Sequence, residues 1–596
     1  MTIARLHKVT IYGPVDKKEK VLADLQDLGC LHLIPLKLIE RPTGIGPSSD
    51  AREALKFLIT CPQQRQQIVE PWAFNAEAVE HEVLYLKQHM EELQNERDLL
   101  RVRIRDIKPW GDFSFPEKGA LHGLSLWFYA VPHNKMDVVE ESDHVWQSVS
   151  RDARFAYIVI IARDEPQDMP VARVHTGGDS PAELVRRFNE DERRLDDLQD
   201  KRMALTRWCY LFTTNIYRLE DQAELAAAST QTHDDAPVFA LQAWAPKKRM
   251  KELNAYAEKT VLAIEAEKPR RDEEPPTLLD NKRAAASGQD LVSFYSTPGY
   301  WLWDPSAIVF YAFAVFFAMI VSDAAYGAVL GIILGLLWRK MGKSAGGKRL
   351  RLLSTVLVLA TIVYGIMVGS YFGVAPPPHS IFGRLKILSV DDYGTMMTIS
   401  ILIGVTHLVI ANIGEMWCKR WSWVMISSLG WILIFAGGTI LWQHFAGSLG
   451  TKSWESAGIG CGVAGLSLVV LFTKTRGPLW KRLLGGLQAL TRLSGAFGDT
   501  LSYLRLFALG LASASLATTF NDLGAQVGAA VPGIGFLLSI IIILLGHGLN
   551  LTLAFASGVI HGLRLNFIEF FNWSMPDEGR PFKAFTKKEA RVAPPA

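Results

Sequence analysis

The residues best placed to do chemistry in this 596-residue sequence are charged and polar side chains inside apolar segments near its C-terminal end. Arg505 lies in the apolar and small-residue segment LSYLRLFALGLASASLA. An arginine at mid-bilayer costs about 2.5–3.5 kcal/mol, so it usually faces a partner or a water-filled path. The alternative is snorkelling to the interface, because Arg505 lies near the start of the expected span. We favour a functional role, which is the default interpretation of an ionisable residue inside a membrane.

A second set of polar residues recurs at spacings of three and four along the segment HGLNLTLAFASGVIHGLRLNFIEFF. This spacing places them on one face of a helix whose opposite face is Leu, Phe and Val. Hydrogen bonding between helices would explain one Asn or Ser, but less readily two histidines and an arginine. The stripe consists of His547, Asn550, Ala554, Ser557, His561 and Arg564.

No acidic residue inside the membrane is expected to pair with these arginines. Asp499 and Glu569 should lie near the cytoplasmic ends of their helices, and Asp323 in an outer turn. We therefore expect a carboxylate on a moving partner to fill this role. An arginine that cannot deprotonate would force such a carboxylate to release its ion before passing, which is the chemistry of a rotary ion channel.

Charge and hydropathy divide the chain into two halves. Residues 301–596 contain 23 Lys and Arg against 12 Asp and Glu, a charge of +11, whereas residues 1–300 carry −8. Apolar runs of about 20 residues in the second half exclude a purely soluble protein. The N-terminus lacks the apolar stretch of a signal peptide, so we expect the first half to stay in the cytoplasm.

The run 306–338 is too long for one upright span, and the basic loop after it belongs on the cytoplasmic side. A hairpin that breaks near Ser322, Asp323 and Gly327 satisfies both conditions, and a single tilted helix is the alternative. With the hairpin there are eight spans, and the loops assigned to the inside hold thirteen basic residues against three outside. The other six spans are expected near 352–374, 394–417, 423–446, 456–473, 497–521 and 534–571.

The first half is predicted to contain two α/β lobes joined by a strut of two long helices. Apolar residues at heptad spacing in 75–107 and 180–228 predict an antiparallel coiled coil, although self-association of the same helices would give the same pattern. Ser180, Pro181 and Glu183 form a helix start with a capping box. In the distal lobe we expect a strand from Leu121, a helix near 135–149 and a strand from Phe155.

The expected fold class is a polytopic α-helical membrane domain, its last two helices long and tilted, after this two-lobe α/β domain. The proximal lobe comprises 1–70 and 236–268, the distal lobe 115–178, the linker 269–304, the transmembrane domain 305–572 and the cytoplasmic tail 573–596. Walker A, HExxH and GxSxG motifs are missing, and the five cysteines form no CxxC pair. We expect no catalytic residue, metal, cofactor or nucleic-acid partner.

The two arginine segments resemble the membrane stator subunit of V-type and A-type rotary ATPases, called subunit a or subunit I. The resemblance covers nearly the whole chain and includes VFALQAWAP, PPTLLDN, the SDAAYG turn, GVTHLVIANIGE and GRPFKAF. It implies that Arg505 faces the carboxylates of a rotor ring of proteolipid subunits, with Arg564 supporting it. Peripheral stalks, a central stalk and the soluble ATPase head would be the other partners, in a plasma membrane with both the N-terminal domain and the C-terminus cytoplasmic.

Two aqueous half-channels are also implied by the resemblance. By depth, Asp499, Ser502 and Glu569 are candidates for the cytoplasmic path, and His547, Asn550 and His407 for the outer or central path. Ordinary packing is the alternative for each of them, while His561 shares its stripe with Arg564. The transported ion, proton or sodium, is left open.

This sequence departs from the family's pattern in several places. Ser322 and Ala325 replace glycines of the family's turn, and Ser513 and Ala554 stand where eukaryotic relatives carry a histidine and a glutamate. The outer half-channel must therefore be built differently. A self-contained secondary transporter with a cytoplasmic regulatory domain is an alternative, but we find no inverted repeat to support it. The other alternative function is a non-transporting membrane scaffold.

Overall fold

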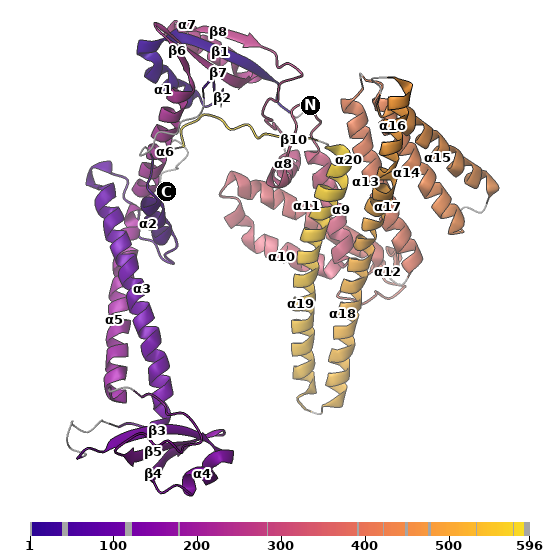
Figure 1. The fold of residues 1–596 in the computed structure, drawn as a ribbon. Coiled ribbons are helices and arrows are strands. Elements are labelled where there is room, and N and C mark those ends of the chain that lie inside the picture. The colour runs from indigo at the N-terminus through magenta and orange to yellow at the C-terminus, as the bar shows by residue number, and fades with distance from the viewer. Residues whose placement is uncertain are drawn as a thin grey trace. The chain divides into compact units, whose positions relative to one another are not determined.

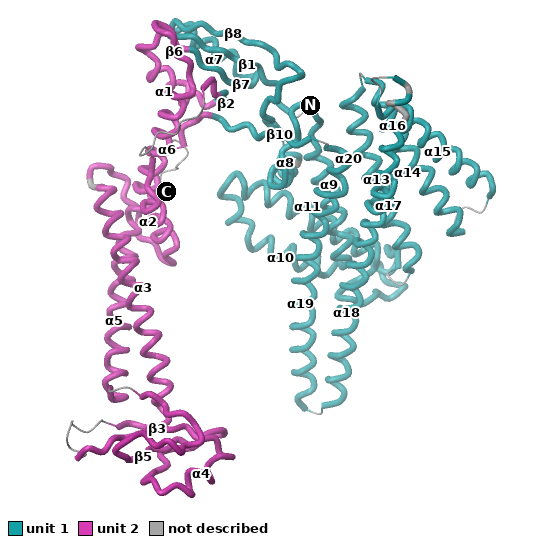
Figure 2. Tube along the Cα trace, viewed as in Figure 1, with its two compact units in different colours: residues 1–13, 30–34, 240–584 teal, residues 14–29, 35–239, 585–596 magenta. Residues whose placement is uncertain are grey.

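The computed structural model describes residues 3–37, 46–113, 122–176, 179–282, 284–389, 392–420, 422–447, 451–474, 478–531, 533–575 and 577–588. Residues 589–596 of the predicted tail, 115–121 and 177–178 of the predicted distal lobe, and 38–45 of the predicted proximal lobe lie outside these ranges. The chain forms two compact units (Figure 2). One contains residues 1–13, 30–34 and 240–584, and the other contains residues 14–29, 35–239 and 585–596.

An antiparallel sheet in the first unit joins segments from both ends of the soluble half. Four of its five strands are β1 (Leu6–Pro14), β2 (His32–Ile34), β7 (Val238–Pro246) and β8 (Ala263–Glu267), in the order β2-β7-β1-β8. The fifth, β6 (His233–Asp235), pairs with β7. Apolar side chains that alternate along β1 and β7 are fully buried, as expected for strands with one face in a core. The sequence VFALQAWAP therefore returns the chain to the first strand, as predicted.

The second unit is built around a helical arm. α3 (Ala76–Ile107) packs along α5 (Pro181–Leu205), and its start shares an apolar cluster with the first turns of α6 (Cys209–Gln231), which follows α5 after a 3₁₀ turn (Figure 1). Val83 and Leu86 at the start of α3 cluster with residues at the end of α5 and in α6, whereas Ile107 clusters with Leu184 at the start of α5. The pairing is therefore antiparallel and lies within one chain. α2 (Ser49–Ile59) covers one end of it.

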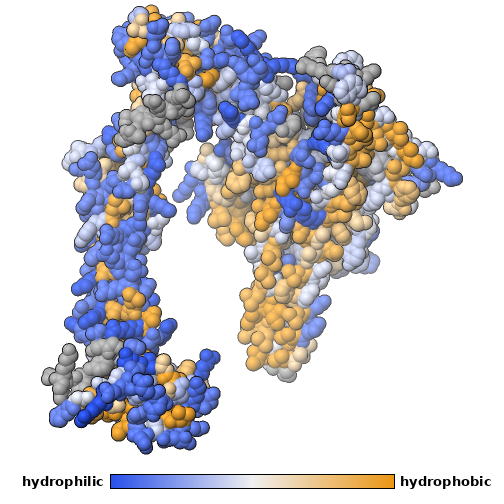
Figure 3. Space-filling model, viewed as in Figure 1, coloured by the Kyte–Doolittle hydropathy of each residue, from blue (hydrophilic) through white to orange (hydrophobic). Residues whose placement is uncertain are grey.

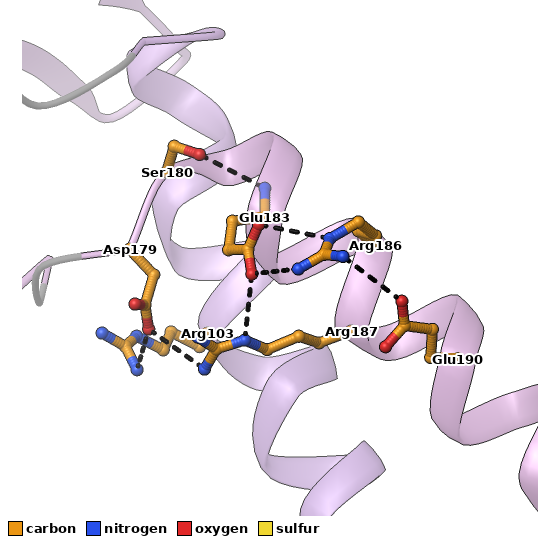
Figure 4. A network of polar contacts seen from close by, with 7 residues as sticks. All are labelled: Arg103, Asp179, Ser180, Glu183, Arg186, Arg187 and Glu190. Carbon is orange, nitrogen blue, oxygen red and sulfur yellow. Dashed lines mark hydrogen bonds and ion pairs between the residues drawn. The ribbon is translucent and has the colours of Figure 1, made fainter.

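The predicted helix start at Ser180 is confirmed and lies in a polar network at one end of the arm (Figure 4). Ser180 Oγ accepts a hydrogen bond from the Glu183 amide at 3.2 Å. Asp179 lies 3.4 Å from Arg103 on α3 and 3.8 Å from Arg187 on α5. The network thus ties the end of α3 to the start of α5.

The distal lobe is a three-stranded antiparallel sheet of order β3-β5-β4, formed by β3 (Ser125–Pro132), β4 (Val145–Arg151) and β5 (Phe155–Ala162). The expected helix near 135–149 is wrong over most of its length. Only a 3₁₀ turn, η4 (His133–Lys135), and α4 (Met136–Glu140) are helical, and the sequence from Val145 to Arg151 pairs with β5 as an edge strand. Its side chains alternate between exposed and half-buried, which is a period-2 pattern that favours a strand.

The C-terminal half is an assembly of apolar helices, and the hydrophobic surface gathers there (Figure 3). Seven helical segments of the described ranges are long and apolar enough to cross a membrane: Ala324–Met341, Ala345–Val368, Tyr393–Cys418, Met425–Phe445, Lys452–Phe472, Leu484–Ala530 and Gly535–Ser574. The eighth expected span corresponds to α9 (Ser306–Val321), whose 16 residues reach about 24 Å. The predicted fold class is confirmed, with seven long spans and one short apolar helix.

The run 306–338 is broken into α9 and α10 (Ala324–Met341), as the hairpin interpretation predicts, so a single tilted helix is wrong. Ser322 has a left-handed backbone with φ 56°, and Asp323 caps α10 by accepting hydrogen bonds from two amides at 2.9 and 3.0 Å. Asp323 also accepts bonds from Ser370 Oγ at 2.7 Å and from the Gly373 amide at 3.0 Å. The Ser322 and Ala325 replacements are therefore compatible with the turn.

The segment predicted as a linker contains a helix. α8 (Ala284–Tyr295) packs against α9 and α11 (Ala345–Val368), so only the charged and proline-rich part before it is extended. A two-residue strand, β9 (Thr297–Pro298), pairs with β10 (Glu578–Gly579) near the C-terminus. The beginning and the end of the membrane part are thus joined by backbone hydrogen bonds.

Candidate functional site: two arginines and a glutamate on the last two long helices

The two long helices α18 (Leu504–Ala530) and α19 (Gly535–Arg564) form an antiparallel pair (Figure 1). Glycines allow close approach: a Cβ at Gly546 would lie 2.3 Å from the Phe520 ring, and one at Gly524 would lie 2.7 Å from Ile543. Small residues at such contacts are typical of membrane helix pairs. Because the helices run in opposite directions, Arg505 at the start of α18 and Arg564 at the end of α19 lie at the same end.

Both arginines lie beside one carboxylate, that of Glu569. Its Oε1 is 3.9 Å from Arg505 Nη1 and 4.0 Å from Arg564 Nε. The Glu569 side chain is only 3% exposed, against 22% for Arg505 and 49% for Arg564. The expectation that no acid of this chain pairs with the arginines is therefore wrong.

The reason is a π-helical turn, η7 (Leu565–Phe570), that follows directly on α19. In an α-helix, residue 569 would lie well away from the face that carries residue 564, because a turn holds 3.6 residues. A π turn closes hydrogen bonds between residues i and i+5, so it brings Glu569 back toward Arg564. Single π turns of this kind are common at functional sites.

The three side chains form a site that still has capacity for another group. Two guanidinium groups, which stay protonated, face one carboxylate, so the cluster favours a further negative charge. Arg505 Nη1 and Glu569 Oε2 are buried and have no hydrogen-bond partner among the described residues. Buried polar atoms are nearly always satisfied in the working state of a protein, so these atoms indicate where an additional group could bind.

The residues that flank the cluster are held by a buried aromatic group around His407. His407 Nδ1 lies 2.8 Å from the hydroxyl of Tyr503, and its ring stacks on Phe570 at 4.3 Å. Tyr503 is two residues from Arg505, and Phe570 follows Glu569 directly. His407 is 4% exposed, so the structure places it behind the charged cluster as a packing and orienting residue.

Three further predicted residues lie around this end of the helices. Asp499 accepts a hydrogen bond from Trp573 Nε1 at 2.7 Å, and Ser502 Oγ donates to the Gly498 carbonyl at 3.0 Å. His561 lies one turn before Arg564, and its Nδ1 is buried without a partner in the described ranges. These contacts fix Asp499 and Ser502 locally, while His561 keeps a free nitrogen near the arginines.

His547 and Asn550 belong to a second polar cluster further along α19. His547 Nδ1 lies 2.8 Å from the Tyr326 hydroxyl, and His547 Nε2 lies 3.0 Å from Asn521 Oδ1. Asn550 Nδ2 donates to the Tyr326 hydroxyl at 2.9 Å and to the Ser513 carbonyl at 2.8 Å. This cluster is roughly 20–25 Å from Arg564 along the helix at 1.5 Å per residue.

The predicted polar stripe is therefore two sites rather than one. Between them α19 packs through small residues: Ala554 is buried, and Gly558 and Gly562 lie against Phe317 and Phe313 of α9. Sequence reasoning missed Tyr326, Tyr503 and Asn521 as members of these clusters. Only Tyr326 had a signal, because it stands in the SDAAYG turn that was already singled out.

Three curated relatives of this chain carry the same subunit name. No family model matches the chain. It is 29% identical to V-type ATP synthase subunit I of Chlamydia pneumoniae over 604 residues, which covers 87% of each chain. Its curated homologues are subunit I of V-type and A-type ATP synthases.

The other subunit I relatives support the same assignment. The protein of Borreliella burgdorferi is 24% identical and covers 98% of this chain and all of its own length. The A-type subunit I of Methanocaldococcus jannaschii is 26% identical over 58% of this chain and 55% of its own. A crystal structure of the cytoplasmic N-terminal domain of subunit I, a homolog of subunit a of V-ATPase, covers 44% of this chain at 18% identity, but its TM-score is 0.23.

Proposed function

We propose that this chain is the membrane stator subunit of a V/A-type rotary ATP synthase. It would provide the half-channels through which protons or sodium ions reach and leave a rotor ring. The convergence of Arg505 and Arg564 on Glu569 carries this proposal, because it places permanent positive charge on the two long helices where a partner can reach it. The subunit I homologues over most of the chain support it. ATP hydrolysis is then the task of other subunits.

In this proposal Arg505 is the residue that a rotor carboxylate meets. The exposed face of α18 beyond Arg505 carries small residues, Ala508, Ala512 and Ser515, which would let a rotor helix pass closely. The arginine cannot release its proton, so a carboxylate that approaches it must be ionised and has therefore given up its cargo ion. Arg505 thus blocks direct leakage between the two half-channels.

Glu569 has a specific part in this proposal. When no rotor carboxylate is near, Glu569 provides the negative charge that keeps Arg505 and Arg564 from repelling each other. When the rotor carboxylate arrives, it binds the Arg505 guanidinium, whose Nη1 makes no hydrogen bond to the described residues. Asp499, Ser502 and His561 remain candidates for the cytoplasmic half-channel, and His547 and Asn550, with Tyr326, for the other.

The arm would serve as the attachment for the peripheral stalks. Its antiparallel helices and distal sheet form a unit that is stabilised by an apolar core and by the network around Asp179. The membrane is expected to be the plasma membrane, with the N-terminal domain and the C-terminus on the cytoplasmic side.

The test is purification of the intact assembly from membranes in mild detergent, followed by measurement of ATP-driven ion pumping in vesicles. We expect rotor-ring and ATPase subunits to copurify, and Arg505→Ala to abolish pumping while assembly is retained. Arg384→Ala, which removes an exposed arginine from the end of α12 (Ile381–Arg384), is the matched control and should pump normally. Isolation of the chain alone, or pumping by Arg505→Ala, would overturn the proposal.

A further inference from the structure

A basic cavity of about 380 Å³ opens among α13 (Tyr393–Cys418), α14 (Met425–Phe445), α15 (Lys452–Phe472), α16 (Leu479–Leu490) and α17 (Arg492–Ser502). It is separate from the arginine and glutamate cluster, and the proposed function assigns it no role. Its charged lining consists of three cations and one carboxylate: Lys419, Lys474, Arg492 and Glu415. The cavity therefore favours an anion.

The cations differ in how they are paired. Lys419 Nζ lies 2.5 Å from Glu415 Oε1, and Ser428 Oγ donates to the other oxygen of that carboxylate at 2.8 Å. Lys474 has no hydrogen-bond or ion-pair partner in the described part of the chain. Among the described residues Arg492 donates only to the Asn572 carbonyl, at 3.3 Å, and it stacks over Trp573 at 5.1 Å. Two positive charges thus remain without a carboxylate.

The lining of the cavity combines two exposed basic side chains, Lys474 and Arg492, with a wall of buried groups. A Cβ at Gly485 would lie 2.3 Å from Cδ of Lys474, so the glycine makes room for the lysine stem to cross α16. Trp431 and Trp573 are buried and contact each other at 4.9 Å, and Trp573 is anchored to Asp499. Ser427 and Thr473 add hydroxyl groups to the lining, 3.0 Å apart.

The surroundings of the cavity favour a lipid. Trp480, Leu484 and Leu487 are exposed on α16 at spacings of four and three residues, so one apolar face of this helix is open beside the cavity. Trp417 is exposed on the last turn of α13, and Trp423 is exposed on the loop that follows it. Tryptophans of this kind gather at the level of lipid headgroups, and basic pockets between membrane helices bind anionic headgroups.

We propose that this cavity binds the phosphodiester headgroup of an anionic glycerophospholipid. Lys474 and Arg492 bind the phosphate oxygens. Ser427 Oγ accepts a hydrogen bond from the polar part of the headgroup, the free hydrogens of Lys419 donate to it, and the acyl chains lie along the apolar face of α16. Because the ligand joins α13, α15 and α17, it stabilises this end of the membrane helices. A free phosphate ion shares the chemistry of the headgroup but has no use for that apolar face.

The test is native mass spectrometry of the full-length chain, delipidated in detergent and titrated with phosphatidylglycerol or phosphatidylcholine. We expect one phosphatidylglycerol to bind more tightly than phosphatidylcholine, and Lys474→Gln/Arg492→Gln to weaken that first binding step by roughly tenfold or more. Arg339→Gln/Lys348→Gln removes the same charges from exposed positions at the end of α10 and the start of α11, outside the cavity, and should bind normally. Lys474→Arg keeps the charge and should retain binding.

Each other result has a defined meaning. An equal loss of phosphatidylglycerol binding in the cavity variant and in the Arg339→Gln/Lys348→Gln control would overturn the proposed site, because it would show an effect of total charge only. Binding of inorganic phosphate in detergent that matches or displaces phosphatidylglycerol would overturn the lipid assignment. Circular dichroism of each variant separates a loss of binding from a loss of folding, and the Lys474→Arg variant keeps the test valid if the double variant does not fold.

Discussion

Glu569 Oε1 lies 3.9 Å from Nη1 of Arg505, across the contact between η7 and α18. Because the carboxylate is buried and the guanidinium is partly exposed, this pair should be weaker than a fully buried ion pair but stronger than a surface one. A carboxylate of this chain therefore offsets part of the positive charge of Arg505 and Arg564.

A double-mutant cycle measures that pair. We expect Glu569→Gln and Arg505→Gln each to lower the free energy of unfolding, and the double variant to lose less than the sum. The coupling should be about 1–2 kcal/mol, since the Arg505 side chain is 22% exposed. Thermal unfolding in detergent gives the values, and Glu569→Gln combined with Arg384→Gln should show no coupling. A coupling near zero for the first pair would contradict the interaction.

The turn between α9 and α10 depends on a glycine of α11. A Cβ at Gly365 would lie 2.2 Å from the Ala324 nitrogen, which is backbone and cannot move aside cheaply. We expect Gly365→Ala to destabilise the membrane part by about 2–3 kcal/mol. Gly335→Ala on α10, where no heavy atom lies within 4 Å of the added Cβ, should be neutral or stabilising because alanine favours helices. Detergent melting curves of both variants give the comparison.

Removal of the Ser180 cap should loosen the start of α5. Ser180→Ala leaves the Glu183 amide without its acceptor, which costs about 1 kcal/mol. Hydrogen exchange at this amide should then be about fivefold faster. Amides near Leu198, in the middle of the same helix, are the internal control and should be unchanged. Equal acceleration along the whole helix would indicate global destabilisation instead of a local cap.

The Cys209 thiol should be nearly unreactive in the folded protein. Burial, with a smaller contribution from neighbouring Cys61, raises the pKa of Cys209 to about 11. At pH 8 roughly one thiol in a thousand is then ionised, and alkylation should accelerate about tenfold per pH unit up to pH 10 without a plateau. Peptide mass spectrometry after iodoacetamide treatment measures this rate. The unfolded protein in urea is the control and should show an ordinary thiol that levels off near pH 9.

The sequence predicted most of the architecture for physical reasons. Heptad spacing located the arm, and hydrophobic runs located the spans, because both patterns follow from burial of one helix face or a whole helix. Asp323 and Ser322 marked the break in 306–338, since a carboxylate at a helix start accepts free amides. The strand β4 was missed because its edge position leaves the apolar Val145 and Val149 exposed and the polar Ser148 half-buried, so apolar and polar residues do not alternate along it.

The charged site was predicted in part. Arg505, Arg564 and Glu569 were each singled out, but their convergence was not, because a single π turn leaves no trace in an α-helical pattern. The prediction of a single polar stripe from His547 to Arg564 assumed that one face of the helix contacts one partner. In the structure the Tyr326 hydroxyl is hydrogen-bonded to His547 and Asn550. Only the tertiary arrangement of α10 against α19 could reveal this.

The split sheet of the first unit sets an order for synthesis. β1 and β2 leave the ribosome first, but β7 begins only at Val238, so at 5–20 residues per second they wait about 10–40 s for their partners. Their edges stay open to wrong pairing during that time. The last strand ends at Glu267, ahead of the first apolar helix at Ser306. Translation thus allows the sheet to close before α9 is made, and a pause in that interval would favour correct biogenesis.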